Sequence, residues 1–245
     1  MNWNALEAEL GTWQAEGLTL PFWWRDDDAT EPTAALDRLY RIATSLDLPL
    51  HLAVIPEPAT EELGQWLNAR GLAVPLVHGW AHRNHEPPER KKAEFGIARP
   101  VETALEDARE GWSRLGGLLG HAPAPLFVPP WNRISPQVAK GLHDIGYRAL
   151  STFGPRKYAN EINTHLDPID WRGTRSVVAP DKLLDQAVAM LADRREGRAD
   201  NSEPFGLLTH HLVHDPAIWD FTETFLRLMA DGPVRPWRAT ELESN

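Results

Sequence analysis

The sequence predicts an α/β fold in which strands and helices alternate, with a barrel favoured over an open doubly wound sheet. Near-continuous apolar runs, which are typical of strands buried on both faces, alternate with helix-like stretches along the chain. Roughly six or seven such units are present without a glycine-rich phosphate loop, and this combination favours the barrel. The length of 245 residues suits one such domain.

Six apolar segments are expected to be strands. In chain order they are residues 18–24, 48–56, 72–80, 124–131, 147–153 and 204–212. Helix-like stretches separate them, at residues 32–46, 59–70, 101–119, 135–146, 181–195 and 216–230. Pro, Ser, Thr or Asp near the first turn, as in "SPQ" at 135 and "DPA" at 215, supports several of these helix starts.

The predicted domain organisation is simple, because neither an internal repeat nor a low-complexity linker divides the chain. An N-terminal helix at about 4–16 lies within residues 1–17. The barrel is expected over residues 18–215, and a C-terminal helix and tail over residues 216–245.

Composition excludes several classes of function. The 25 basic and 35 acidic residues give a net charge of -10, which opposes a nucleic-acid partner. The absence of cysteine excludes disulfides, thiolate catalysis and cysteine-bound metals, so any metal must lie on His, Asp or Glu. No secretion signal and no run of about 18 apolar residues is present, so we expect no membrane span and a cytoplasmic location. The oligomeric state stays open.

Unusual polar clusters follow four of the predicted strands. They are "RDDD" at 25–28, "HGWAHRNH" at 78–85, "PPWNR" at 129–133 and "THHLVHD" at 209–215. In a parallel barrel the carboxyl ends of the strands share one rim, where such folds assemble active sites. We therefore expect these clusters to meet.

Three consecutive aspartates directly behind a buried strand need a physical explanation. One of them could favour the N-terminus of the following helix, near Pro32. Three like charges would repel one another unless a cation or a proton relieves them. The four-residue spacing of His78 and His82 suits a shared metal if the imidazoles lie on one side of a helical turn, although two unrelated loop histidines would look the same.

Taken in order, these motifs resemble the polysaccharide deacetylase-like superfamily, carbohydrate esterase family 4. The resemblance covers roughly residues 18–215 and fits a divergent branch. It implies a distorted (β/α)7 barrel that carries one divalent metal, zinc first, with Co²⁺, Ni²⁺ or Mn²⁺ as alternatives. It also implies an acylated amino sugar as the substrate class.

The resemblance transfers roles to individual positions. The metal ligands fall on Asp28, His78 and His82, and the catalytic base falls on Asp27. A frame shift to Asp27 as ligand and Asp26 as base stays open. The remaining motifs fall on Pro130 and Trp131, on Asp170 and Trp171, and on His210, which the family's Leu-x-His pattern selects over His211.

Two positions depart from the family pattern. The arginine that contacts the base in the third motif is replaced by Val128, so Arg25 or Arg133 is expected to substitute for it. Gly79 stands where the family often has Ser or Thr. The substrate is therefore not assumed to be chitin.

The expected chemistry is hydrolysis of an amide. Asp27 accepts the proton of the attacking water, and His210, oriented by Asp170, protonates the departing amine. Trp131 and Trp171, with Trp23, Trp24 and Trp80, are candidates for walls that hold sugar rings, and at least two of these five are expected in the core. Pro130 and Arg25 complete the expected binding site.

Three other functions compete with this interpretation. Two histidines and one carboxylate also suit a non-haem Fe(II) oxygenase, although the alternation of strands and helices opposes it. A non-catalytic carbohydrate-binding relative is the second, and hydrolysis of an ester or another C–N bond on a small metabolite is the third.

Overall fold

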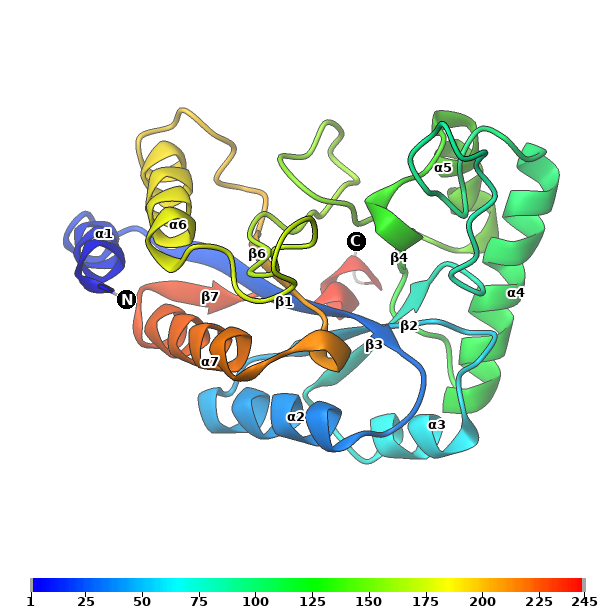
Figure 1. Cartoon of the computed structure of the whole chain (residues 1–245), viewed down its shortest axis with the longest axis horizontal. Helices are drawn as coiled ribbons and strands as arrows, with labels where there is room; N and C mark the ends of the chain where they lie inside the picture. The colour runs from blue at the N-terminus through cyan, green and yellow to red at the C-terminus, as the bar shows by residue number, and fades with distance from the viewer. Residues whose placement is uncertain (1, 244–245) are drawn as a thin grey trace.

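A parallel β-sheet forms the centre of the molecule in the computed structural model, which describes residues 2–243 (Figure 1). The strand order is β5-β4-β3-β2-β1-β6, and β7 pairs with β1. The strands are β1 (Leu20–Ala29), β2 (Leu50–Val54), β3 (Ala73–His78), β4 (Leu126–Val128), β5 (Ala149–Leu150), β6 (Phe205–Thr209) and β7 (Val234–Pro236). The sheet curls into a distorted (β/α)7 barrel, as predicted.

The sheet has no regular strand between β5 and β6 in the described part of the chain, and the extended segment 160–166 lies there instead. On one side, the N–H of Leu150 donates to Asn160 O at 3.0 Å and the N–H of Ile162 donates to Leu150 O at 2.9 Å. On the other side, the N–H of Leu208 donates to Leu166 O at 2.8 Å. Single bridges thus replace a full strand ladder, which is why the barrel is distorted.

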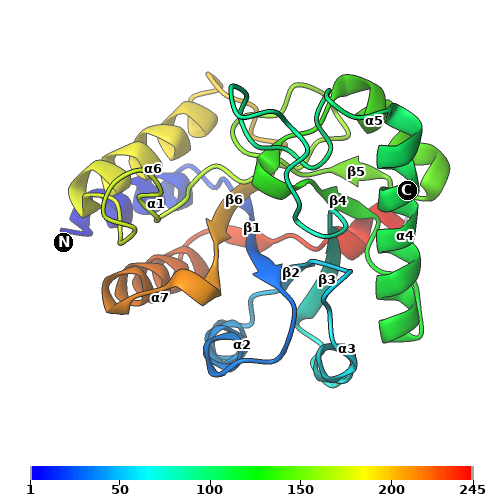
Figure 2. The ribbon, with the colours of Figure 1, turned by 45° about the vertical axis from the view of Figure 1, so that its right-hand side comes forward.

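Helices surround the sheet (Figure 2). They are α1 (Asn4–Ala15), α2 (Ala34–Leu46), α3 (Glu61–Asn68), α4 (Val101–Leu119), α5 (Pro136–Gly141), α6 (Pro180–Arg195) and α7 (Pro216–Asp231). The side chains of Thr33, Thr60, Ser135 and Asp215 accept hydrogen bonds from the first turns of α2, α3, α5 and α7. The helix boundaries read from the sequence are confirmed to within two residues, except that the stretch expected as one helix over 135–146 divides into α5 and a 3₁₀ helix over Leu142–Ile145. No described helix combines the length and apolar character that crossing a bilayer requires.

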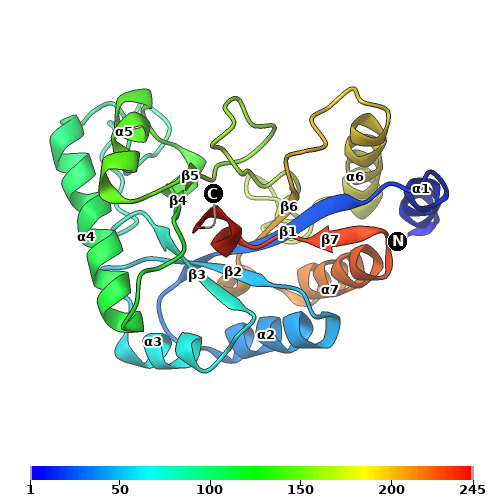
Figure 3. The same cartoon turned by 180° about the vertical axis from the view of Figure 1, so that it is seen from behind.

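Strands β4 and β5 are shorter than the segments 124–131 and 147–153 that the sequence predicted, and two other strands differ in where they lie. Strand β1 continues to Ala29, so the three aspartates lie within the strand and not behind it. Strand β7 lies in the C-terminal tail, beyond the expected barrel range of 18–215, and pairs with residues 20–22 of β1 (Figure 3). Pro233 directly before this strand and Pro236 at its end hid it, because proline argues against a strand.

Two of the tryptophans that the sequence placed near the rim are buried in the core. Trp23 and Trp24 are each 1% exposed, and their indole N–H groups donate to Asn163 O and Thr209 Oγ1. These two residues therefore pack the core and do not line a sugar site. Trp80 and Trp131 are partly exposed, and Trp171 is 37% exposed.

Candidate metal centre and active site

A β-bulge separates the three aspartates of β1. Asp26 pairs with Leu52, but three residues later Ala29 pairs with Val54, so β1 holds one extra residue, and Asp28 adopts φ 76°. Regular alternation would point Asp26 and Asp28 to the same face. The bulge instead re-aims Asp28, as bulges near active sites commonly do. Each carboxylate then has its own set of partners, which explains how three like charges coexist.

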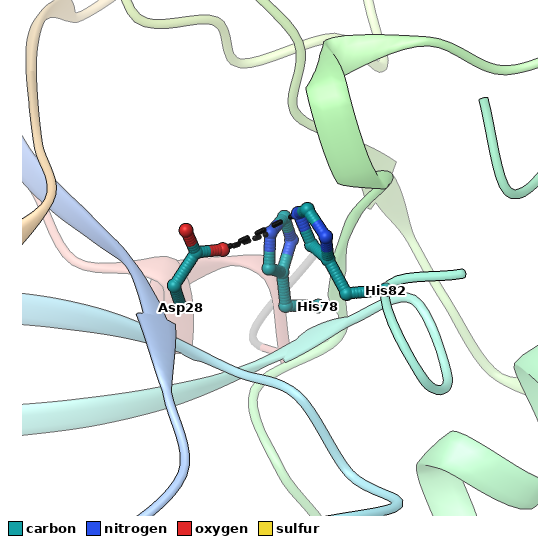
Figure 4. A group of neighbouring side chains, drawn as sticks. All are labelled: Asp28, His78 and His82. Carbon is teal, nitrogen blue, oxygen red and sulfur yellow. Dashed lines mark hydrogen bonds and ion pairs between the residues drawn. The ribbon is translucent and has the colours of Figure 1, made fainter. Parts of the chain in front are cut away.

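Asp28 lies against the two histidines that the sequence singled out (Figure 4). Its Oδ1 is 3.2 Å from His78 Nε2 and 3.4 Å from His82 Nε2. The ligand atoms of all three side chains lie within 4.8 Å of one another. The Nδ1–H of His78 donates to the carbonyl oxygen of Val128 at 3.0 Å and so turns Nε2 towards Asp28, where a bound cation would take the place of the Nε2 proton.

The donor set fits a divalent cation. Two imidazoles and one carboxylate are the protein ligands of many catalytic zinc sites, which keep the remaining position open. Burial raises the pKa of Asp28, but the hydrogen bond and charge of His78 outweigh it, so that the pKa lies well below its usual value. The carboxylate is therefore ionised at neutral pH, as a metal ligand must be.

The loop that carries His82 is not the helical turn that the spacing suggested. His82 adopts φ 52° and Gly79 adopts φ 61°. The buried carboxylate of Glu94 organises this loop, because it accepts hydrogen bonds from the backbone N–H groups of Trp80, Ala81 and Arg83 at 2.9–3.2 Å. A Cβ on Gly79 would lie 2.3 Å from Glu94 and 2.6 Å from Pro130. Glycine at this position thus permits close packing around the loop.

The predicted base, Asp27, is held by Arg25. The guanidinium donates from Nε to Asp27 Oδ1 at 2.8 Å and from Nη2 to Oδ2 at 2.9 Å, a bidentate arrangement. Arg25 is fully buried, and its Nη1 donates to Ser151 Oγ at 2.6 Å. Arg25 and Arg133 were the two predicted substitutes for the arginine that contacts the base. Arg25 makes this contact with Asp27, whereas Arg133 donates to the backbone carbonyl of Lys92.

Asp26 has a different environment on the other side of β1. It is fully buried and accepts hydrogen bonds from Thr209 Oγ1 at 2.7 Å, from the N–H of His211 at 3.0 Å and from His211 Nδ1 at 2.5 Å. Burial opposes ionisation of both partners, but their mutual attraction raises the pKa of His211 and lowers that of Asp26. This pair joins the ends of β1 and β6.

His210 and His211 point to different groups. His210 Nε2 lies 4.0 Å from Asp27 Oδ2, and the ring packs edge-on against Trp171 with centroids 4.7 Å apart. His211 is engaged with Asp26. The structure thus brings His210, not its neighbour, to the predicted base.

Asp170 does not reach His210 within the described residues. Its carboxylate accepts hydrogen bonds from the N–H groups of Gly173 and Thr174 and closes its own turn. Asp167 is the acidic residue whose pKa His210 affects: burial raises the pKa of Asp167 above its usual value, and the nearby His210 offsets only part of that rise. Asp167 also accepts the indole N–H of Trp171 at 2.7 Å.

Trp131 and Pro130 lie at the end of β4, beside the metal cluster. The Trp131 ring packs on His82 with centroids 4.3 Å apart, and Pro130 is buried against Gly79. Together with Asn132, the two residues form the short 3₁₀ turn η1 (Pro130–Asn132). They therefore border the cluster of Asp28, His78 and His82.

Four functional-site neighbours were missed by the sequence reasoning: Glu94, Asn132, Ser151 and Asp167. Glu94 and Ser151 are common polar residues outside any motif, and only tertiary packing gives them their contacts. Asn132 lies within "PPWNR" at 129–133, but nothing in that motif distinguished it. Asp167 stands three residues before Asp170 in "DPIDW", so this motif offered both acids without distinguishing them.

Comparisons with solved structures place this geometry in a known fold. A candidate polysaccharide deacetylase from Mycobacterium smegmatis superposes with a TM-score of 0.63 at 17% identity, over 87% of this chain and 77% of that chain. A peptidoglycan deacetylase from Bacillus subtilis gives a TM-score of 0.58 at 15% identity, over 92% and 91% of the two chains. A family 4 acetyl xylan esterase from Clostridium thermocellum, in complex with a cobalt ion, gives 0.52 at 14%, over 91% and 90%.

The chain has the fold of the carbohydrate esterase family 4 deacetylases. No protein-family model matches it, and no curated protein matches it significantly in sequence. The likeness to this deacetylase fold is therefore one of structure, and the chemistry has to be argued from the side chains.

Proposed function

We propose that this chain is a metal-dependent hydrolase of a divergent family 4 branch that removes the acetyl group from an N-acetylated amino sugar. The observation that carries the proposal is the convergence of Asp28, His78 and His82 beside Asp27, with His210 facing the same base. A bound divalent cation, zinc first, would acidify a water molecule and polarise the substrate carbonyl. The acetyl xylan esterase of the same fold is in complex with a cobalt ion, which supports metal binding by this chain.

Asp27 serves as the general base in this proposal. The two hydrogen bonds from Arg25 fix the orientation of its carboxylate, which is thereby placed to accept the proton of the attacking water. The backbone N–H of Trp131 is the proposed donor to the substrate carbonyl oxygen as negative charge develops there.

His210 serves as the general acid. Its Nε2 lies 4.0 Å from Asp27, so one reacting amide fits within reach of both groups. Protonation of the departing amine by His210 completes the hydrolysis to acetate and a free amine. We propose no orienting role for Asp170, because its carboxylate is used within its own turn. Trp171, which packs on His210, is the proposed wall for the sugar ring.

The test measures acetate release by zinc-loaded and metal-free protein. The substrates are N-acetylglucosamine oligosaccharides, a sugar nucleotide bearing N-acetylglucosamine, acetylated xylan and 4-nitrophenyl acetate. Release from an N-acetylated sugar, and only with zinc, is the expected result. Release confined to the acetate esters would assign esterase activity, which the acetyl xylan esterase neighbour makes the second candidate.

Inactivity on all four substrates at full zinc occupancy would contradict the proposal and favour a carbohydrate-binding role or a small-metabolite substrate. Anaerobic purification with metal analysis separates the remaining rival. Iron bound in preference to zinc would indicate an oxygenase site instead.

A further inference from the structure

Two consecutive residues beside the metal cluster hold an unfavourable backbone conformation. Trp131 has φ 57° and ψ 16°, and Asn132 has φ 56°. Asparagine tolerates the left-handed region, but a bulky residue such as tryptophan rarely adopts it. Such conformations persist only where the surroundings hold them.

The side chain of Asn132 supplies a holding contact. Its Oδ1 accepts a hydrogen bond from Arg25 Nη2 at 2.7 Å, and its backbone N–H donates to Pro129 O at 3.0 Å. Arg25 is a rigid anchor, because it is fully buried and its other N–H groups bind Asp27 and the end of β5. The turn is therefore tied to the group that orients the base.

This left-handed turn also fixes the position of the Trp131 indole. This ring packs against His82 with centroids 4.3 Å apart. His82 has the less enclosed ring of the two histidines, with a side chain 25% exposed against 2% for His78. Packing by Trp131 thus restricts the His82 ring, which the rest of the fold encloses less than it encloses the His78 ring.

We propose that Asn132 is a positioning residue, whose hydrogen bond to Arg25 locks the left-handed turn and so holds Trp131 against His82. The guanidinium of Arg25 then positions two groups: the base Asp27 directly, and the metal ligand His82 through Asn132 and Trp131. This inference rests on the proposed function only in requiring that the cluster bind a divalent cation. Groups that orient metal ligands typically change metal affinity about 10–100-fold when they are removed.

Two substitutions separate the contact from the backbone conformation. Asn132→Gly keeps the left-handed turn, which glycine adopts readily, but removes the acceptor. Asn132→Asp keeps an acceptor oxygen in the same place. Asp47→Gly is the matched control, because Asp47 is also a left-handed non-glycine residue, with φ 50°, at the C-terminus of α2.

The zinc dissociation constant, measured by competition with a fluorescent chelator, is the first readout. We expect Asn132→Gly to bind zinc about tenfold more weakly, and Asn132→Asp and Asp47→Gly to bind it as the wild type does. Wild-type zinc affinity in Asn132→Gly would overturn the inference while leaving the proposed function intact.

Amide hydrogen exchange of residues 131–134 in the metal-free proteins is the second readout, and it does not depend on zinc. We expect these amides to exchange faster in Asn132→Gly than in Asn132→Asp. The ratio of the two rates should exceed the ratio by which Asp47→Gly speeds exchange in its own turn relative to the wild type. If the wild type binds no zinc, the proposed function fails, and this comparison still decides the inference. Equal exchange in the two Asn132 variants would overturn it.

Discussion

At the scale of single residues, the aspartates of β1 divide their work because their partners differ. Asp28→Asn removes a predicted ligand and should lower the zinc content of the purified protein. Asp27→Asn should keep the zinc and lose turnover, because an amide cannot accept the water proton. Elemental analysis and acetate release measure the two effects. The reverse pattern would shift the register to Asp27 as ligand and Asp26 as base.

The adjacent histidines should also respond differently. His210→Ala should lose about 10²–10⁴ in turnover with little change in stability, as expected for a general acid. His211→Ala leaves the buried charge of Asp26 without its main partner, so the free energy of unfolding should fall by about 3–5 kcal/mol. Urea unfolding and steady-state kinetics distinguish them. If both variants stayed stable and lost turnover equally, the assignment of His210 as the general acid would be contradicted.

At the scale of elements, the β3–α4 loop depends on glycine at position 79. Gly79→Ala combines φ 61° with contacts of 2.3 Å to Glu94 and 2.6 Å to Pro130, so it should cost about 2–4 kcal/mol and weaken zinc binding through His82. Gly120→Ala is the control, because Gly120 has φ 73° with open space around it and should cost only about 1–2 kcal/mol. Thermal unfolding of both variants tests this. Equal costs would remove the packing explanation.

The sequence predicted most elements well because their signals are local. Apolar periodicity and the caps at Thr33, Thr60, Ser135 and Asp215 mark the strands and helices directly. Segment 160–166 and β7 were missed, since isolated bridges and proline-containing strands lack that periodicity. The Arg25–Asp27 contact was one of the two substitutes that the sequence offered for the arginine missing at Val128. The bulge at Asp28 depends on pairing with β2, and the contact of Arg25 with Ser151 joins segments far apart in the sequence. Such features follow from tertiary contacts, which the order of residues does not display.

At the scale of the whole molecule, His51 makes stability depend on pH. Its Nδ1–H donates to Trp24 O at 3.0 Å and its Nε2 accepts the N–H of Ala239 at 3.1 Å, so the folded protein requires the neutral ring. Burial lowers the pKa of His51 from 6.5 to about 3. Between these values the unfolded chain binds the extra proton, so this contribution to stability is lost as the pH falls below 6.5.

Urea unfolding of the wild type and His51→Leu from pH 6.5 to pH 5 measures that contribution. The variant should be less stable at pH 6.5, because two buried hydrogen bonds are lost. Its unfolding free energy should depend on pH less steeply, with a slope difference approaching about one proton, or 1.4 kcal/mol per pH unit. Parallel pH profiles for the two proteins would show that His51 is protonated equally in both states.

The whole account depends on a metal held by Asp28, His78 and His82 and used for hydrolysis. The most direct test titrates metal-free protein with zinc while acetate release from 4-nitrophenyl acetate and an N-acetylglucosamine oligosaccharide is followed. Activity should rise linearly to one equivalent and then level off, and His78→Ala should stay inactive at that ratio. Full activity without metal, or a wild-type rise that His78→Ala reproduces, would contradict the account.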